Sequence, residues 1–259
     1  MKTRLRLFAM LVALPAGAQE KPAGVDEILA RVQAQKASYE ASLPDFLCDE
    51  KRTSQRFRAD RPDWQATSES AFRVERNIQH KGKSPFIETR QIVSMNGKPS
   101  RAKRFKGPLT FEDGVAEAFS MFAVENARCY NYRLEGQPES ASASPVLRIA
   151  FASRPGQSEP GGACAGRLPD QTGEIVVDAE TYSVVRFEAR SPHPGPKNAV
   201  LTYSVEFSKT PIGGDVFWMP SEVKAELTNT EKPVRLVYTA RYSNYRKFEA
   251  SSSVTYAAP

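Results

Sequence analysis

Few residues of this chain have both the type and the spacing that catalysis or metal binding requires. The two histidines, His80 and His193, are far apart, and no group of His, Cys and carboxylate residues has the spacing of metal ligands. Ser158 lies in a stretch that imitates a nucleophile elbow but ends in proline and lacks the strand–turn–helix context. The acidic pair Asp49-Glu50 is typical of a solvated turn. We therefore predict that the protein is not an enzyme and holds no metal and no cofactor.

The basic stretch 101–106 is the best candidate for binding a partner. Its positively charged side chains are Arg101, Lys103, Arg104 and Lys106. Clustered like charge raises the local potential, so this stretch could make a peripheral contact with anionic lipid head groups or bind an acidic protein of the cell envelope. The alternative is a solvated edge strand whose charges protect it against pairing.

A second candidate surface consists of aromatic residues on the strands predicted for the last third of the chain. These residues are Phe187, Tyr203, Phe207, Trp218 and Tyr238. They could line the inside of a curved sheet and hold an apolar ligand there. The alternative is that they fill the core beneath the helices, as inward-facing aromatic side chains usually do.

The chain has three cysteines, Cys48, Cys129 and Cys164, which allow one disulfide and leave one thiol over. We favour a Cys129–Cys164 bridge, because these two residues flank an excursion rich in Ser, Pro and Gly that a bridge would tether. Cys48 follows an apolar strand start and is expected to be a small buried side chain. A Cys48 nucleophile acting with a distant histidine is the formal alternative, and the sequence does not decide the pairing.

The elements that would position these residues follow from hydrophobic periodicity. Apolar residues at helical spacing predict a helix over 24–42 that packs on a sheet, and Pro44 follows its end. A short second helix is predicted over 112–122. Strands are predicted over 46–58, 66–79, 85–95, 98–105 (after an Asn96-Gly97 turn), 128–135 and 145–152, in a hairpin 173–188 around a 178–181 connection, and in alternating runs from Leu201, Val223 and Val234. No helix alternates regularly with these strands, so the sheet should be antiparallel.

The N-terminus has the features of a cleavable secretory signal. Lys2, Arg4 and Arg6 precede a short apolar run and an A-x-A site, which places cleavage after Ala18. Removing residues 1–18 lowers the formal net charge from +6 to +3, and so modest a charge on an exported chain makes nucleic acid an implausible partner. We expect a periplasmic or secreted monomer in which residues 19–44 form an amphipathic helix and residues 45–259 form a single antiparallel β domain.

Several short motifs, read together, resemble a family of exported, largely uncharacterised bacterial proteins. The motifs are Leu43-Pro-Asp-Phe-Leu-Cys48, Met95-Asn-Gly-Lys98, Gly173-Glu-Ile-Val-Val-Asp178 with Thr181 and Arg186, Tyr203 through Gly214, Met219-Pro220 and Tyr245-Arg-Lys-Phe248. The sheet over residues 173–250 is similar to that of the LolA/LolB lipoprotein-carrier-like superfamily. This resemblance implies a mostly β (α+β) fold, in which one or two helices cover a curved antiparallel sheet that forms an incomplete barrel.

In lipoprotein carriers the concave side of that sheet holds acyl chains. The resemblance therefore implies a non-catalytic protein that binds an apolar or lipidic ligand, such as a lipid or a lipoprotein acyl chain, against the aromatic surface. The alternative is a cell-envelope interaction or structural module whose core is filled and which binds through its basic stretch.

Overall fold

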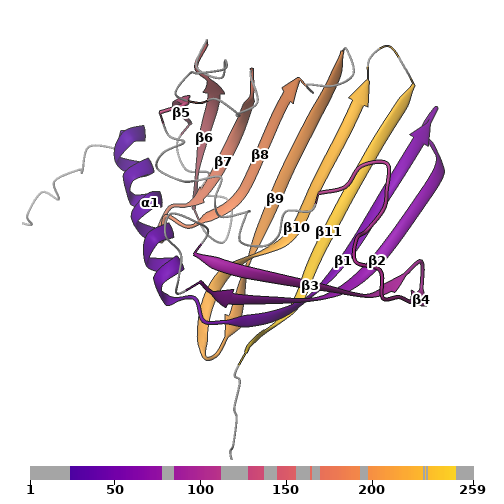
Figure 1. The fold of residues 1–259 in the computed structure, drawn as a ribbon. Coiled ribbons are helices and arrows are strands. Elements are labelled where there is room, and N and C mark those ends of the chain that lie inside the picture. Colours follow the sequence, from indigo (N-terminus) through magenta and orange to yellow (C-terminus); the bar gives the residue numbers. More distant parts are fainter. Residues whose placement is uncertain are drawn as a thin grey trace, which may run out of the picture.

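The computed structural model describes residues 24–77, 85–111, 128–136, 145–155, 164, 170–192, 198–229, 231 and 233–248. Within these residues the chain forms one α-helix and an eleven-stranded antiparallel sheet (Figure 1). The elements are α1 (Val25–Ser42), β1 (Phe46–Arg58), β2 (Arg61–Arg76), β3 (Phe86–Met95), β4 (Lys98–Pro99), β5 (Tyr130–Glu135), β6 (Val146–Ser153), β7 (Thr172–Asp178), β8 (Val184–Pro192), β9 (Ala199–Ile212), β10 (Asp215–Asn229) and β11 (Val234–Lys247). The predicted fold class is confirmed. The signal segment 1–18 and the second helix predicted over 112–122 lie outside the described residues.

Strand order in the sheet departs from chain order at one place. The order is β4-β3-β2-β1-β11-β10-β9-β8-β7-β6-β5, so every strand neighbours its successor in sequence except β4, whose successor β5 lies at the opposite edge; the two halves of the sheet join where β1 pairs with β11. Among the described residues β4 and β5 are the two edges, and the sheet is not closed into a barrel. The first and last of the described strands therefore meet in the interior of the sheet.

Backbone angles test two of the predicted turns. Asn96 and Gly97 have φ values of 49° and 74°, and a type I′ turn needs positive φ at both central positions, so this turn is confirmed. The connection between β7 and β8 was predicted over residues 178–181. It runs over residues 179–183 instead, because β7 ends at Asp178 and β8 begins only at Val184. Asp178 Oδ1 accepts hydrogen bonds from the Thr181 backbone N–H at 2.8 Å and from its hydroxyl at 2.9 Å, which stabilises the wider turn.

Irregular pairing bends the sheet at its β1–β3 end. The register shifts between Leu47 and Asp49 where β1 pairs with β11, and between Arg56 and Phe57 where β1 pairs with β2. Such bulges add a residue on one strand and bend it. Figure 1 shows the result: β1 and β2 curve, and β3 runs across the direction of β9–β11.

One face of the sheet, called here the inner face, can be followed through the pairing register. Its central row runs from β5 to β2 through Leu134, Ile149, Ile175, Phe187, Val205, Val223, Ala240, Arg52 and Ser68. The row is apolar from β5 to β11 and becomes polar at β1. At the apolar end, Ile28 and Val32 of α1 pack on it, which confirms that the helix covers the sheet.

Close packing in the next row requires a glycine. Gly173 of β7 pairs with Phe151 of β6 and with Ala189 of β8. A Cβ on Gly173 would lie 2.0 Å from the Glu188 carbonyl oxygen and 2.5 Å from the Phe151 ring. Without that Cβ, the Phe151 ring stacks on Phe187, with ring centroids 5.5 Å apart.

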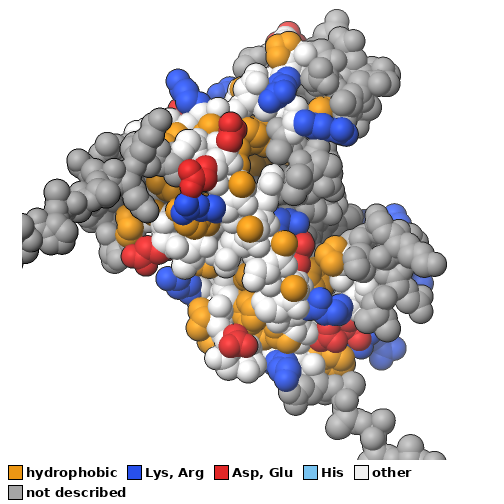
Figure 2. Space-filling view, turned by 90° about the vertical axis from the view of Figure 1, so that its left-hand side faces the viewer, with side chains coloured by type: hydrophobic (Ala, Val, Ile, Leu, Met, Phe, Trp, Pro, Cys, Tyr) orange, Lys and Arg blue, Asp and Glu red, His pale blue; other side chains and the backbone are white. Residues whose placement is uncertain are grey.

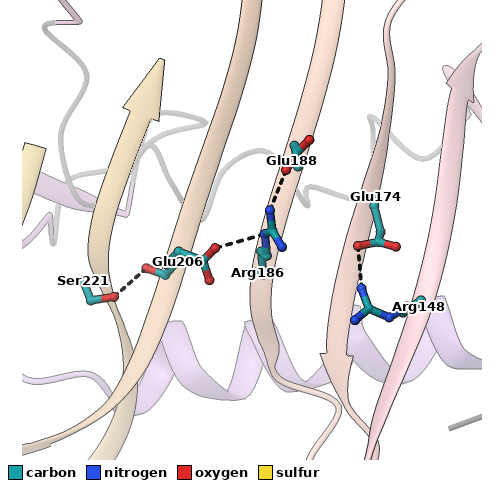
Figure 3. A network of polar contacts seen from close by, with 6 residues as sticks. All are labelled: Arg148, Glu174, Arg186, Glu188, Glu206 and Ser221. Atoms are coloured by element: carbon teal, nitrogen blue, oxygen red, sulfur yellow. Dashed lines mark hydrogen bonds and ion pairs between the residues drawn. The ribbon is translucent and has the colours of Figure 1, made fainter. Parts of the chain in front are cut away.

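The opposite face, called the outer face, carries ion pairs on successive strands (Figure 3). Arg186 of β8 contacts Glu188 at 2.6 Å and Glu206 of β9 at 3.0 Å, and Arg148 of β6 contacts Glu174 of β7 at 2.9 Å. Arg186 and Glu188 alternate with Phe187 along β8, so they lie on the face opposite to it. These side chains are between a quarter and half exposed, so each pair contributes about 0–1 kcal/mol to stability.

The strand predicted over 98–105 is wrong beyond its first two residues. Only Lys98–Pro99 is a strand, and the chain then leaves the sheet as an irregular segment that we call the strap, residues 100–111. The strap lies against the inner face, because Phe105 is buried in the core and Leu109 and Phe111 pack on it. Residues 100–111 are therefore held by apolar packing on the inner face and not by pairing as an edge strand.

The surface on the α1 side mixes both signs of charge. In Figure 2 the lysines, arginines, aspartates and glutamates are interspersed, with hydrophobic side chains between them. The one described helix, α1, is not apolar enough over its length to cross a membrane.

Candidate functional site

A small groove lies on the inner face where α1 approaches β8, β9 and β10. Its apolar lining comes from Val32 and Tyr39 of α1 and from Val184, Phe207 and Trp218 of the sheet. Polar groups of Gln35, Lys36, Tyr182 and Ser183 complete the lining. The cavity volume is about 40 Å³, which is room for about three water molecules. We call this site the α1 groove.

The two ends of α1 are held differently. At the C-terminal end, the Arg76 guanidinium donates hydrogen bonds to the carbonyl oxygens of Ala41 and Leu43 at 3.0 and 2.9 Å, and these carbonyls would otherwise have no helical partner. At the N-terminal end, Gly24 provides no side-chain cap. The contacts there include the packing of Val25, Ile28, Leu29 and Val32 and a hydrogen bond from Arg31 to the Tyr182 hydroxyl.

The five aromatic residues proposed as a ligand surface divide between groove and core. Phe207 and Trp218 line the α1 groove. Phe187 is buried against Phe151, and Tyr203 and Tyr238 pack on the Phe111 ring of the strap at 5.6 and 5.5 Å. The sequence could not make this division, because alternation does not say what covers each side chain, and Trp218 shares a face with Phe207 only through the register shift between Pro220 and Glu222. Their ligand-binding role stays a prediction.

The strap is fixed to β1 through Ser54. The Ser54 hydroxyl donates a hydrogen bond to the Leu109 carbonyl at 2.6 Å and accepts one from the Leu109 backbone N–H at 3.3 Å. Gly107 allows this approach, since a Cβ there would lie 2.5 Å from the Ser54 side chain.

The four basic residues of the candidate interaction patch all lie on the strap. Arg101, Lys103, Arg104 and Lys106 are exposed, while Phe105 between them is buried. They do not belong to an edge strand, which was the alternative considered from the sequence. Their role in binding a partner stays a prediction.

Beneath the strap lies a buried group of charges, Glu50, Arg52 and Arg90, that we call the charged cluster. The Glu50 carboxylate contacts both guanidinium groups: Arg90 donates a hydrogen bond at 3.0 Å and forms an ion pair through Nε at 2.9 Å, and Arg52 Nε lies at 3.3 Å. Arg52 Nε also donates to the Ser68 hydroxyl at 3.1 Å. The Glu50 and Arg52 side chains have no exposed surface, and Arg90 is 13% exposed.

Aromatic rings surround this cluster. The Arg52 guanidinium lies 4.8 Å from the ring centre of Phe105, and that of Arg90 lies 4.8 Å from the ring centre of Phe72. Such cation–π contacts stabilise a cation that water does not reach. Burial, and after it the Glu50 carboxylate, raises the pKa of the Tyr238 and Tyr242 hydroxyls. Both tyrosines are therefore neutral next to the cluster.

The charged cluster is a correction to the sequence analysis. Asp49-Glu50 does not form a solvated turn, because it lies within β1 and Glu50 is 1% exposed. The sequence did contain a sign of this burial. Glu50 and Arg52 follow Phe46 and Cys48 at intervals of two residues, and strand alternation therefore places all four side chains on the inner face. Arg90 could not be found in this way, because its proximity depends on the register between β2 and β3.

The cysteines lie as predicted. Cys129 and Cys164 form a disulfide, and Cys48 is a free thiol that is fully buried. Burial, with a further contribution from Glu50 and Asp49, raises the pKa of the Cys48 thiol, so the nucleophilic thiolate is disfavoured. Within the described ranges, no group of His, Cys, Asp and Glu residues could hold a metal ion, and His80, His193 and Ser158 lie outside those ranges.

Comparison with known proteins gives likenesses of structure only. No family model matches the chain, and no curated protein sequence does. The structure is similar to that of a DUF1329 family protein from Desulfovibrio piger, with 11% identity and a TM-score of 0.42 over 88% of this chain and 95% of the other. It is also similar to a LolA superfamily protein from Nitrosomonas europaea, with 10% identity and a TM-score of 0.36 over 88% and 96%.

Proposed function

We propose that this protein is a non-catalytic binder of an apolar or lipidic ligand, and that the α1 groove is where the ligand enters. The observation that carries the proposal is the incomplete burial of Trp218, which is half-buried at the mouth of the groove beside Phe207 and Val184. Ligand sites are typically apolar concavities with a few polar groups at the edge, and Lys36 and Gln35 supply those groups here.

The asymmetric attachment of α1 supports enlargement of the groove. Arg76 fixes the C-terminal end of the helix through backbone carbonyls, whereas the N-terminal end is held by apolar packing of Val25, Ile28, Leu29 and Val32 and by the contact of Arg31 with Tyr182. A helix held in this way can pivot about its C-terminal end. A pivot would separate Val32 from the sheet and open a longer channel over Phe187 and Ile175, whose apolar side chains would then cover an acyl tail.

The natural tryptophans make this proposal directly testable. The chain has two, and Trp64 is exposed on β2, away from the groove. In Trp64→Phe protein, Trp218 is the sole tryptophan, and we expect its emission to fall on titration with the fluorescent fatty acid cis-parinaric acid. Unchanged Trp218 emission at saturating probe would count against the groove.

A bulkier side chain in the groove provides the second test. Val184→Phe should fill the cavity and weaken binding of the fatty acid by about tenfold or more, because each excluded methylene forfeits ~0.8 kcal/mol. The matched control is Val93→Phe on β3, where the valine is 46% exposed and does not line the groove. Equal affinity of both variants would contradict the proposal.

We also propose that the protein works outside the cytoplasm. The Cys129–Cys164 disulfide is consistent with an oxidising compartment, and the sequence features of residues 1–18 predict export with cleavage after Ala18. Residues 45–259 would then form one domain capped by α1. Mass spectrometry of protein from the periplasm or the medium checks this, and a retained Met1 N-terminus would contradict it.

A further inference from the structure

The strap and the residue pair before it concentrate positive charge in one short segment. Residues 98–106 carry five basic side chains and no acidic one, and the nearest acidic residues in the sequence are Glu88 and Glu112. The five are Lys98, Arg101, Lys103, Arg104 and Lys106. Their charge exceeds the net charge of +3 that remains without residues 1–18, so the rest of that shorter chain is slightly acidic. The basic character of the protein therefore lies in this segment.

The apolar residues of the strap anchor it and leave its basic residues at the surface. Phe105 is buried, and Ala102, Leu109 and Phe111 pack on the same core. Hydrogen bonds to β1 and a ring contact with β11 hold the strap across the inner face (Figure 1). The basic side chains between these anchors are exposed, so they are presented to the solvent on a fixed support.

The charge of this segment is not neutralised within the described part of the protein. None of the five basic side chains forms an ion pair or a hydrogen bond with another described residue. Exposed arginines of the sheet, such as Arg186 and Arg241, do pair with carboxylates. Clustered like charge raises the local potential and attracts counterions or an oppositely charged partner.

We propose that the strap docks the protein on membrane surfaces that contain anionic lipids, through attraction between the five basic side chains and the lipid head groups. Clusters of about four to eight Lys and Arg residues are typical of segments that bind anionic membranes. Three of the five are lysines, and lysine is depleted from protein–protein interfaces. A lipid surface requires charge without a fixed arrangement of partners, so the composition favours a membrane over an acidic protein.

The contact should be peripheral and electrostatic. Phe105 is the one aromatic side chain among residues 98–106, and it is buried over the Arg52 guanidinium, where it cannot enter a bilayer. Attraction between exposed charges is screened by salt, so binding should be reversible and should disappear at high ionic strength. Docking of this kind does not depend on the α1 groove or on its ligand.

Sedimentation with sucrose-loaded vesicles tests the proposal. The protein is taken as the cell processes it, with its N-terminus determined by mass spectrometry, because Lys2, Arg4 and Arg6 would add to the binding if they were retained. At low salt, wild-type protein should bind phosphatidylglycerol-containing vesicles at least about tenfold more tightly than vesicles of phosphatidylcholine alone, and about 0.5 M NaCl should remove the difference. Equal binding to both kinds of vesicle at low salt would overturn the proposal.

Charge reversal on the strap locates the contact. Arg101→Glu with Lys103→Glu should weaken binding to the phosphatidylglycerol-containing vesicles at least about tenfold, since each basic residue near an anionic surface contributes roughly fivefold to the affinity. The matched control is Arg190→Glu with Lys224→Glu, which makes the same change in net charge at exposed positions on the outer face. The control should bind nearly as tightly as the wild type. Equal losses in the two variants would overturn the proposal, because the attraction would then come from net charge alone.

Further variants keep the result interpretable. If the charge-reversal variant does not fold, Lys103→Gln with Lys106→Gln removes two charges from exposed positions, and unchanged vesicle affinity in that variant would also overturn the proposal. Val184→Phe, which fills the α1 groove, should bind vesicles as the wild type does, so a failure of ligand binding and a failure of docking can be told apart. Retention of the wild type on a polyglutamate column without binding to vesicles would mean that the strap binds an acidic protein, against the proposal.

Discussion

The α1 groove and the charged cluster lie on the same face of one sheet. An apolar side chain is partly exposed in the groove, whereas charged side chains are fully buried in the cluster. In the groove an indole, Trp218, is half-buried at a surface opening. In the cluster the side chains of Glu50 and Arg52 are completely buried under the strap. Exposed apolar surface and buried charge both cost stability, so each marks a place where the sheet is not optimised for its own packing. The difference lies in what covers the inner face, which is a helix over apolar side chains at one end and the strap over buried charges at the other.

The largest expected effect comes from removing the negative charge of the cluster. Glu50→Gln leaves two buried arginines without their shared carboxylate, and we expect a loss of about 3–5 kcal/mol in the free energy of unfolding. Urea denaturation measures it. Glu69→Gln is the control, because its pair with Lys51 is exposed and should contribute about 0–1 kcal/mol. A loss for Glu50→Gln as small as that of the control would mean that water reaches the cluster.

Each end of the inner face also depends on one glycine. Replacing these two glycines by alanine should lower the free energy of unfolding by different amounts. Gly173→Ala sets a methyl group 2.0 Å from a backbone carbonyl, which cannot move within the sheet, so we expect a loss of at least ~3 kcal/mol. Gly107→Ala meets side-chain atoms alone, those of Ser54 at 2.5 Å and of Thr110 at 3.3 Å, and the strap can shift, so a loss of about 1 kcal/mol is expected. Thermal unfolding of both variants ranks them. The reverse order would show that the strap is held more rigidly than the sheet.

Alkaline pH should weaken both ends together. Burial raises the pKa of Tyr132 to about 12, and burial also raises the pKa of Tyr39 at the groove and of Tyr238 near the cluster. Because the folded state holds these protons more tightly than the unfolded state, stability is complete below pH ~10 and falls as the pH rises toward about 12. Unfolding midpoints in urea between pH 8 and 12 check this, with tyrosinate absorbance followed in parallel. Midpoints that stay constant up to pH 12 would contradict burial of these hydroxyls.

The smallest effect is expected at Cys48, which lies on the inner face of the same strand as the cluster. Its thiol is buried and its pKa is raised, so Ellman's reagent at pH 8 should not react with the native protein. The same reagent should titrate Cys48 after unfolding in guanidinium. Rapid reaction of the native protein would show that the β1 end of the sheet opens readily.

Features that depend on neighbouring residues in the sequence could be predicted, and features that depend on contacts between distant residues could not. Alternation and turn chemistry are local, so the strands, the Asn96-Gly97 turn and α1 could be predicted. The strap could not, because its run of basic residues imitates an edge strand, and only contacts with distant β1, through Ser54 and Gly107, draw it away from the sheet. The charged cluster likewise depends on three strands aligning in register.

The pairing of β1 with β11 also sets the order in which this protein can form. β1 precedes β2–β10 in the chain and β11 follows them, so the edge of β1 that pairs with β11 has no partner until β11 has been synthesised. Contacts so distant in sequence form slowly, and an unpaired strand edge in the meantime invites association with other chains. A truncation before Val234 would leave β1 and β10 as permanent open edges. A nascent chain of this protein therefore exposes that edge of β1 until β11 has emerged.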